Sequence, residues 1–175
     1  MQVIKKIVFH FSLFYSMAVA ANSSTPLNAL KVCLFQHSSI EGEGYSPIDI
    51  SAVIIDGDYS ASGEVHYAEY NGSAIGYGAS QSGMAFYKGA KPYPLSKSKV
   101  IETGLPIKIV PEEIDYAVSE WGSIKLNKRD FICVNVPFSG IGESGQHQDI
   151  RNVFVYDIKG NDIYYTVGNV RGEIQ

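Results

Sequence analysis

The chain has 175 residues, of which 45% are hydrophobic and 18% charged, and its formal net charge is −4. The first 20 residues hold two of the 14 basic residues and none of the 18 acidic ones, so the other 155 carry a net charge of −6. That length predicts a single domain with a buried core, and that charge argues against binding to a phosphate backbone and therefore to nucleic acid.

The first segment has the order of a secretory signal peptide. Lys5 and Lys6 precede the mainly apolar stretch Ile7–Val19, and small residues follow at Ala18 and Ala20. A stretch of about thirteen residues is too short to cross a bilayer as a helix, which needs about twenty. We therefore expect cleavage after Ala20, a domain over 21–175, and export to the periplasm or the extracellular space.

The two cysteines, Cys33 and Cys133, lie in apolar runs typical of strands, Leu30–Phe35 and Phe131–Val136. Disulfides persist in exported proteins, and only one pairing is possible within this chain. A cysteine nucleophile is the alternative, but His37, four residues from Cys33, would lie about 13 Å away along a strand. We predict a Cys33–Cys133 bridge between neighbouring strands.

The next elements are a loop over Ser38–Pro47 and a strand over Ile48–Ile55. A hairpin follows, with its turn at Asn71-Gly72, because both central residues of a type I′ turn need positive φ. Gly83–Lys88 and Leu105–Val110 are further predicted strands, and Lys91–Pro94 must be extended or turning because of its prolines.

One helix is predicted from Pro111 to about Trp121, since proline fits the first helical position and apolar residues repeat at helical spacing. Ile150–Ile158 and Asp162–Val167 are the last predicted strands, with a turn at Gly160-Asn161. The fold class is therefore mainly β, an antiparallel sandwich or barrel of about eight or nine strands with one short helix.

The motifs that suggest cofactor or metal binding lack the context they need. Gly140–Gly145 matches the G-x-G-x-x-G string of dinucleotide sites, but a predicted strand follows where the helix should begin. The histidines after the leader, His37, His66 and His147, show no paired metal-ligand spacing. We therefore predict neither a cofactor nor a metal ion.

A hydrolase is a further alternative, because Ser144, His147 and Asp149 place a hydroxyl, an imidazole and a carboxylate within six residues. Catalytic triads usually assemble from distant segments around an oxyanion hole. A single loop seldom provides that geometry, so we assign no catalytic residue.

The residues that remain favour a binding protein, because tyrosine among Ser, Gly and Asn is typical of recognition surfaces. The predicted contact loops are Ser38–Pro47, Asp56–Gly63 and Ser139–Asp149. The predicted binding residues are Glu41, Glu43, Tyr45, Asp56, Asp58, Tyr59, Glu143, Ser144 and His147.

The leading hypothesis is an exported, non-enzymatic protein that binds another protein, cationic in character, such as an inhibitor or immunity protein for a cell-envelope enzyme. The alternative from another class is a secreted effector or toxin that acts on membranes or glycans. The sequence leaves the oligomeric state open.

Overall fold

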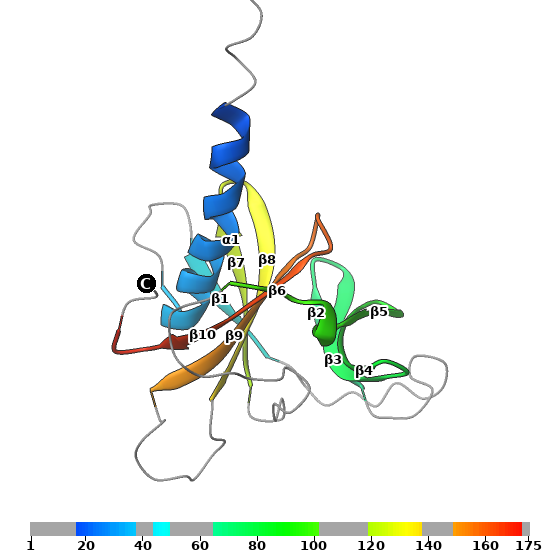
Figure 1. Ribbon diagram of the computed structural model, residues 1–175. Helices are drawn as coiled ribbons and strands as arrows, with labels where there is room; N and C mark the ends of the chain where they lie inside the picture. The colour runs from blue at the N-terminus through cyan, green and yellow to red at the C-terminus, as the bar shows by residue number, and fades with distance from the viewer. Residues whose placement is uncertain (1–16, 38–43, 50–64, 102–118, 138–148, 173–175) are drawn as a thin grey trace, which may run out of the picture.

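The computed structural model describes residues 17–37, 44–49, 65–101, 119–137 and 149–172 (Figure 1). These residues form one α-helix, one short 3-10 helix and ten strands in two sheets. The larger sheet has the order β1-β7-β8-β9-β10-β6, and the smaller one β2-β3-β4-β5. The bounds are α1 Met17–Phe35, β1 Gly44–Ile48, β2 Val65–Tyr70, β3 Ser73–Ser80, β4 Gly83–Lys88, β5 Lys91–Pro94, η1 Leu95–Lys97, β6 Lys99–Val100, β7 Glu120–Leu126, β8 Arg129–Pro137, β9 Ile150–Asp157 and β10 Ile163–Asn169.

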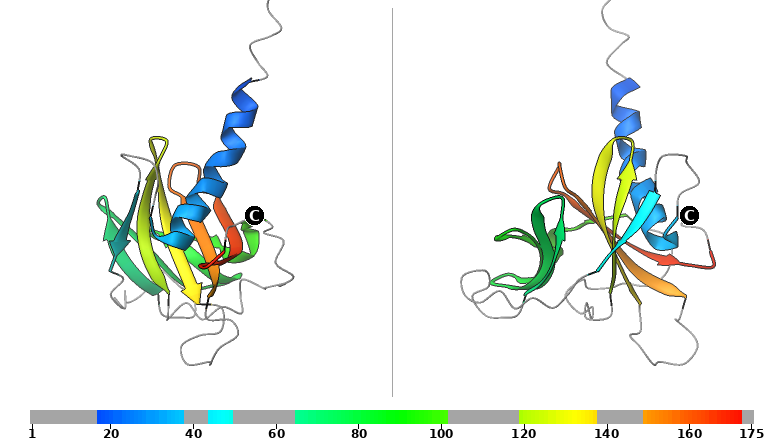
Figure 2. Two further views of the ribbon diagram at one scale, coloured as in Figure 1. Left: turned by 90° about the vertical axis from the view of Figure 1, so that its left-hand side faces the viewer. Right: turned by 180° about the vertical axis from the view of Figure 1, so that it is seen from behind.

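The six-stranded sheet lies in the middle of the molecule. Helix α1 packs on one of its faces, and residues of the four-stranded sheet pack on the other (Figures 1 and 2). Both faces are covered because apolar side chains of β9 point to each in turn: Val153 and Val155 face α1, while Phe154 and Tyr156 face the smaller sheet. The predicted mainly β sandwich is confirmed, and the two sheets are not closed into a barrel.

Both predicted hairpins are confirmed. Asn71 and Gly72 have φ of 49° and 71° and join β2 to β3, as a type I′ turn requires. Asn161, with φ of 56°, lies in the turn that joins β9 to β10. A third turn, at Asn127-Lys128, also has two positive φ values, and it was not predicted because it contains no glycine.

The prediction of a strand over Leu30–Phe35 is wrong, because this run is the last part of α1. Ala29 and Cys33, and likewise Leu30 and Leu34, are four residues apart and are all buried against the sheet. A short apolar run fits a buried helix as well as a central strand, and here the long-range packing decides.

Two other boundaries differ from the predictions. Trp121, expected at the end of a helix, lies in strand β7, while 111–118 are outside the described residues. Gly44–Pro47, expected in a loop, belongs to edge strand β1, which ends at Ile48, where the next strand was expected to begin. The predicted strand Leu105–Val110 also lies outside the described residues, and β5 confirms that Lys91–Pro94 is extended.

The Cys33–Cys133 disulfide is present and fully buried, with a Cα–Cα distance of 5.4 Å. It joins α1 to the central strand β8, whereas we had expected it to join two neighbouring strands. The bridge therefore fixes the helix layer to the sheet, at a sequence separation of 100 residues.

Candidate functional site

One end of the six-stranded sheet, called the loop end below, collects strand termini that are far apart in sequence. The registers pair Ile48 with Trp121, Glu120 with Asn135, and Pro137 with Arg151. The last residue of β1, the first of β7, the last of β8 and the start of β9 therefore lie next to one another. The opposite end, called the hairpin end, carries the β7–β8 and β9–β10 turns.

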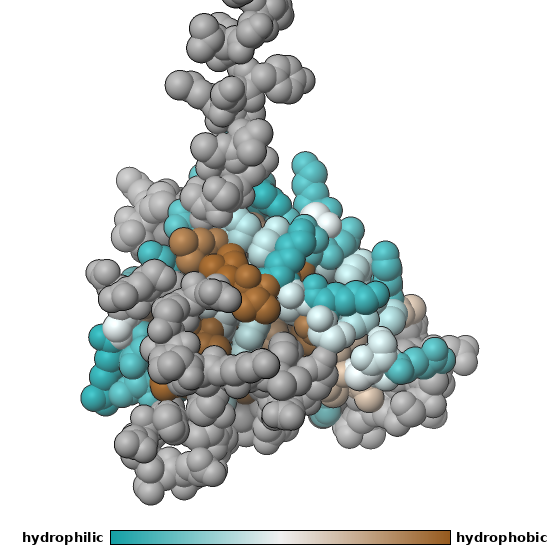
Figure 3. Space-filling model, in the orientation of Figure 1, coloured by the Kyte–Doolittle hydropathy of each residue, from teal (hydrophilic) through white to brown (hydrophobic). Residues whose placement is uncertain are grey.

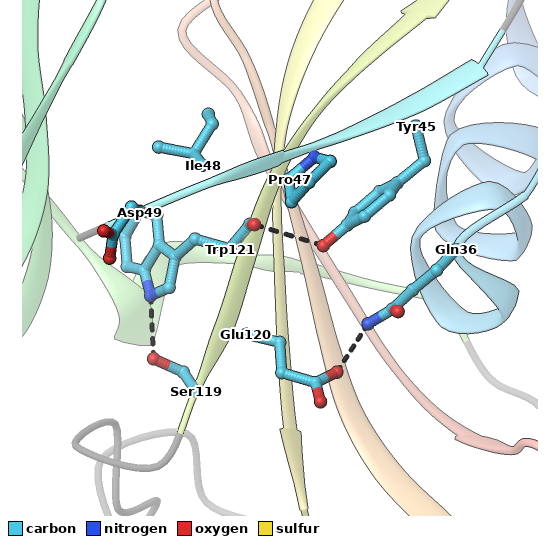
Figure 4. Close-up of a pocket in the computed structure, with 8 residues that line it drawn as sticks. All are labelled: Gln36, Tyr45, Pro47, Ile48, Asp49, Ser119, Glu120 and Trp121. Atoms are coloured by element: carbon cyan, nitrogen blue, oxygen red, sulfur yellow. Dashed lines mark hydrogen bonds between the residues drawn. The ribbon is translucent and has the colours of Figure 1, made fainter.

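A groove of about 430 Å³ lies at the loop end, between edge strand β1, the start of β7 and the carboxyl end of α1 (Figure 4). Its lining combines polar and aromatic side chains. The lining residues are Gln36, Tyr45, Pro47, Ile48, Asp49, Ser119, Glu120 and Trp121.

Tyr45 forms one wall of the groove, and its position depends on a glycine. The ring lies directly over Gly122 of β7, where any Cβ atom would overlap the ring carbons. The Tyr45 hydroxyl donates to the carbonyl oxygen of Trp121 at 3.1 Å. Burial, and after it the Glu120 carboxylate, raises the pKa of Tyr45 above its ordinary value of 10.0, so the phenol is neutral at physiological pH.

Trp121 supplies the base of the groove, although its ring belongs mainly to the core. It is 5% exposed, and its indole Nε1 donates to the Ser119 hydroxyl at 2.7 Å. The ring also stacks on Tyr77, with centroids 5.6 Å apart. A ring held in this way is not free to stack on a sugar.

Glu120 is held beside the carboxyl end of α1. Gln36 follows the helix with φ of 55°, and its side-chain amide donates to the Glu120 carboxylate (Figure 4). Two carbonyls of the last helical turn, those of Cys33 and Leu34, accept from the buried Asn135 side chain, both at 3.3 Å. The groove therefore has a polar wall in which Gln36, at the end of the helix, is bonded to the first residue of β7.

The electrostatics of the groove favour a cation. Asp49 and Glu120 are exposed carboxylates, and the carboxyl end of α1 adds the negative end of the helix dipole. The groove contains acceptors for an ammonium or guanidinium group, which makes its strongest hydrogen bonds to carboxylates.

Of the predicted binding residues, the structure places only Tyr45, and it lies in this groove. The others, Glu41, Glu43, Asp56, Asp58, Tyr59, Glu143, Ser144 and His147, are outside the described residues. Segments 50–64, 102–118 and 138–148 each join a described strand at the loop end, through Asp49, Ser119, Pro137 and Asp149. These three segments contain eight Asp or Glu and one Lys.

The hydrolase alternative remains a prediction, since Ser144 and His147 are outside the described residues. Asp149 is described, and its carboxylate forms an ion pair with Arg171 at 3.0 Å. Of the other histidines, His37 bonds to the carbonyl of Phe35 through Nδ1, and His66 stacks on Tyr77 at 4.9 Å. No three potential metal ligands gather within the described part of the chain.

Sequence reasoning missed most of the groove. Gln36, Asp49 and Glu120 are separated by up to 84 residues and meet only through the β1–β7 pairing and the end of α1. No local motif marks them. The nearest signal was Gly122, whose missing side chain leaves space for the Tyr45 ring.

No protein-family model, curated protein or solved structure matches this chain significantly. Function is therefore inferred from the groove, the sheet topology and the distribution of charge.

Proposed function

We propose that this is an exported, non-enzymatic binding protein that recognises a cationic surface of another protein through the loop end, as an inhibitor or immunity protein of a cell-envelope enzyme would. The observation that carries the proposal is the acidic groove beside the edge strand β1. A Lys or Arg side chain of the partner would enter this groove between Asp49 and Glu120.

The sequence around the groove supports a wide contact. The three segments that join the sheet at this end are acidic, and they contain six of the nine binding residues predicted from sequence. Complementary charge of this kind speeds association and selects the partner. Among the described strands β1 forms the edge of its sheet, so an extended segment of the partner would pair with it, although Pro47 lacks one backbone donor there.

Two features support export. The buried disulfide is of the kind that persists in oxidising compartments. The leader over 1–20 has the order of a signal peptide. No helix in the described ranges has both the length and the apolar character needed to cross a membrane.

The buried ring of Trp121 favours a protein partner over a glycan, because glycan sites use exposed aromatic rings for stacking. An effector or toxin that acts on glycans is thus ranked second. It predicts that the protein is retained on glycan columns and that Glu120→Gln is retained equally well.

To test the proposal, the protein is made in an oxidising compartment and used as bait for envelope proteins at low salt, and the activity of each captured enzyme is measured against added bait. We expect capture of an enzyme whose activity falls in proportion to bait and recovers at high salt.

Glu120→Gln is the decisive variant, since it removes one charge and keeps an acceptor for Gln36. We expect about a fivefold weaker inhibition, the size of one exposed charge pair. Glu69→Gln, an exposed carboxylate of β2 in the smaller sheet, is the matched control and should inhibit normally. Equal loss in both variants, or capture without inhibition, would contradict the proposal.

A further inference from the structure

Basic residues outnumber acidic ones in the part of the chain that the structure describes. The described residues include 11 Lys or Arg and 7 Asp or Glu, a net charge of +4. Outside them, and after residue 20, there are one basic and 11 acidic residues, a net charge of −10. The described residues are therefore basic, although the chain after residue 20 has a net charge of −6.

Six of these 11 basic residues lie around the β9–β10 turn at the hairpin end. Lys88 of β4 donates to the carbonyl of Ile158 at 3.0 Å, and Lys99 of β6 pairs with Asp162 at 2.8 Å. Arg129 of β8 pairs with Asp157, whose side chain is fully buried. Three strands, β4 of the smaller sheet and β6 and β8 of the larger one, thus bring cations to one turn.

Three further lysines extend this group. Lys159 lies in the turn itself, Lys128 is in the β7–β8 turn beside Arg129, and Lys91 lies over the ring of Tyr93, which bonds to Asn161 of the same turn. All three lysines are exposed. We call the whole group the basic end: Lys88, Lys91, Lys99, Lys128, Arg129 and Lys159.

Amphipathic side chains accompany the basic end. Tyr93 and Tyr164 lie 5.1 and 5.5 Å from the Nζ atoms of Lys91 and Lys99. Val100, beside Lys99, is 62% exposed, and no other large apolar side chain among the described residues is exposed. Figure 3 shows the hydrophilic side chains of this region with apolar ones beside them. Lysines with tyrosines and exposed apolar groups are typical of membrane interfaces.

The amino end of α1 lies at the same end of the molecule. Figures 1 and 2 show α1 rising past the β7–β8 hairpin, while its carboxyl end lies near Glu120 at the loop end. The residues that precede α1 in sequence include the apolar stretch from Ile7. In the proposed export this stretch is the signal segment, so the chain enters the domain at the hairpin end, through the amino end of α1.

We propose that the basic end docks on an anionic phospholipid surface, which leaves the acidic loop end facing away from the membrane. The overall negative charge does not prevent this, because at physiological salt charges further away than about 8 Å are largely screened. Docking needs only the reversible attraction of several cations to headgroup phosphates, at about a fivefold gain in partition for each.

The test is sedimentation of the purified protein with vesicles. We expect binding to vesicles of phosphatidylglycerol and phosphatidylcholine in equal parts, no binding to phosphatidylcholine alone, and release at high salt. Lys128→Asn with Lys159→Gln should lower binding by more than tenfold. Asparagine tolerates the positive φ at position 128, so this variant keeps the turn.

The matched control removes two charges elsewhere, with Lys31→Gln on α1 and Arg171→Gln at the loop end, and should bind as the wild type does. Unaltered unfolding midpoints show that both variants fold. Absent binding to anionic vesicles, equal loss in the two variants, or retention on heparin with no vesicle binding would each overturn the proposal. None of these outcomes bears on inhibition by the loop end, which Glu120→Gln tests separately.

Discussion

The two faces of the six-stranded sheet are packed by different means. The face toward α1 is mainly aliphatic and contains the disulfide. Its fully buried members include Leu30, Ile124, Phe131, Val153 and Val155. The face toward the smaller sheet is aromatic, with rings from both sheets and no covalent link among the described residues. Its rings are Tyr77, Phe86, Trp121, Phe154, Tyr156 and Tyr165.

The aromatic face is held by ring geometry. Phe154 is central, with its centroid 5.7 Å from Phe86 and 4.6 Å from Tyr165, and Phe86 lies 5.6 Å from Trp121. Aromatic pairs at such distances contribute about 0.5 to 1.5 kcal/mol beyond the area they bury. The helix is thus held to one face of the sheet by a covalent bond, whereas the smaller sheet is held to the other face by contacts between rings.

The largest expected effect is on the helix face. Replacing both Cys33 and Cys133 by alanine should lower the free energy of unfolding by about 4 kcal/mol, because the bridge closes a loop of 100 residues in the unfolded chain. Urea titration followed by Trp121 fluorescence measures it, since Trp121 is the single tryptophan and lies on the opposite face. A reductant should lower the free energy of unfolding of the wild type by the same amount. A decrease below about 1 kcal/mol in the double variant would show that packing alone holds α1.

The second expectation compares neighbours on opposite faces of one strand. Phe154→Ala should cost about 3 to 5 kcal/mol through the cavity it leaves among the rings. Val153→Ala, equally buried against α1, should cost about 2 kcal/mol because it removes only two methyl groups. Urea unfolding of the two variants gives the comparison, and equal losses would refute the division of packing proposed for the faces.

The smallest effect concerns pH and the aromatic face alone. Burial raises the pKa of Tyr165, whose hydroxyl donates to Asn152 at 2.9 Å, while tyrosine in an unfolded chain titrates near 10. The unfolded chain therefore loses its proton first, so stability is complete below about pH 10 and falls as the pH rises above it.

Tyr165→Phe tests this assignment. At neutral pH it should cost about 1 kcal/mol for the lost hydrogen bond. Above about pH 10 its stability should fall less steeply than that of the wild type, with the remaining slope due in part to Tyr156, whose pKa burial also raises. Urea unfolding at pH 9 and 11 measures this change, and an equal fall in the free energy of unfolding for the wild type and the variant would contradict the assignment.

Local rules predicted the last three strands and two hairpin turns. Strands β8, β9 and β10 follow from β-branched and aromatic runs bounded by turn residues, and the Asn71-Gly72 turn follows from its need for positive φ. The disulfide followed from counting cysteines. The strands and turns depend on residues that are adjacent in sequence, so they can be predicted from one sequence alone.

The elements that were missed depend on long-range packing. The leader was separated from the domain, so the helical spacing of Ala29, Leu30, Cys33 and Leu34 was interpreted as a short strand. Pro26 lies inside α1, where proline lacks the backbone donor and is unfavourable, so the local sequence argued against a helix there. Strand β7 was missed because Gly122 and Ser123 interrupt its apolar pattern. Since the groove is lined by the start of β7, it could not be predicted either.

The position of the disulfide also sets an order of events in biosynthesis. Cys33 is made 100 residues before Cys133, a delay of about 5 to 20 s at ordinary rates of synthesis. Until β8 exists, the thiol on α1 has no partner within the chain, since the sequence holds only two cysteines. Mispairing inside the chain is thus excluded, and the hazard in that interval is a cross-link to another molecule.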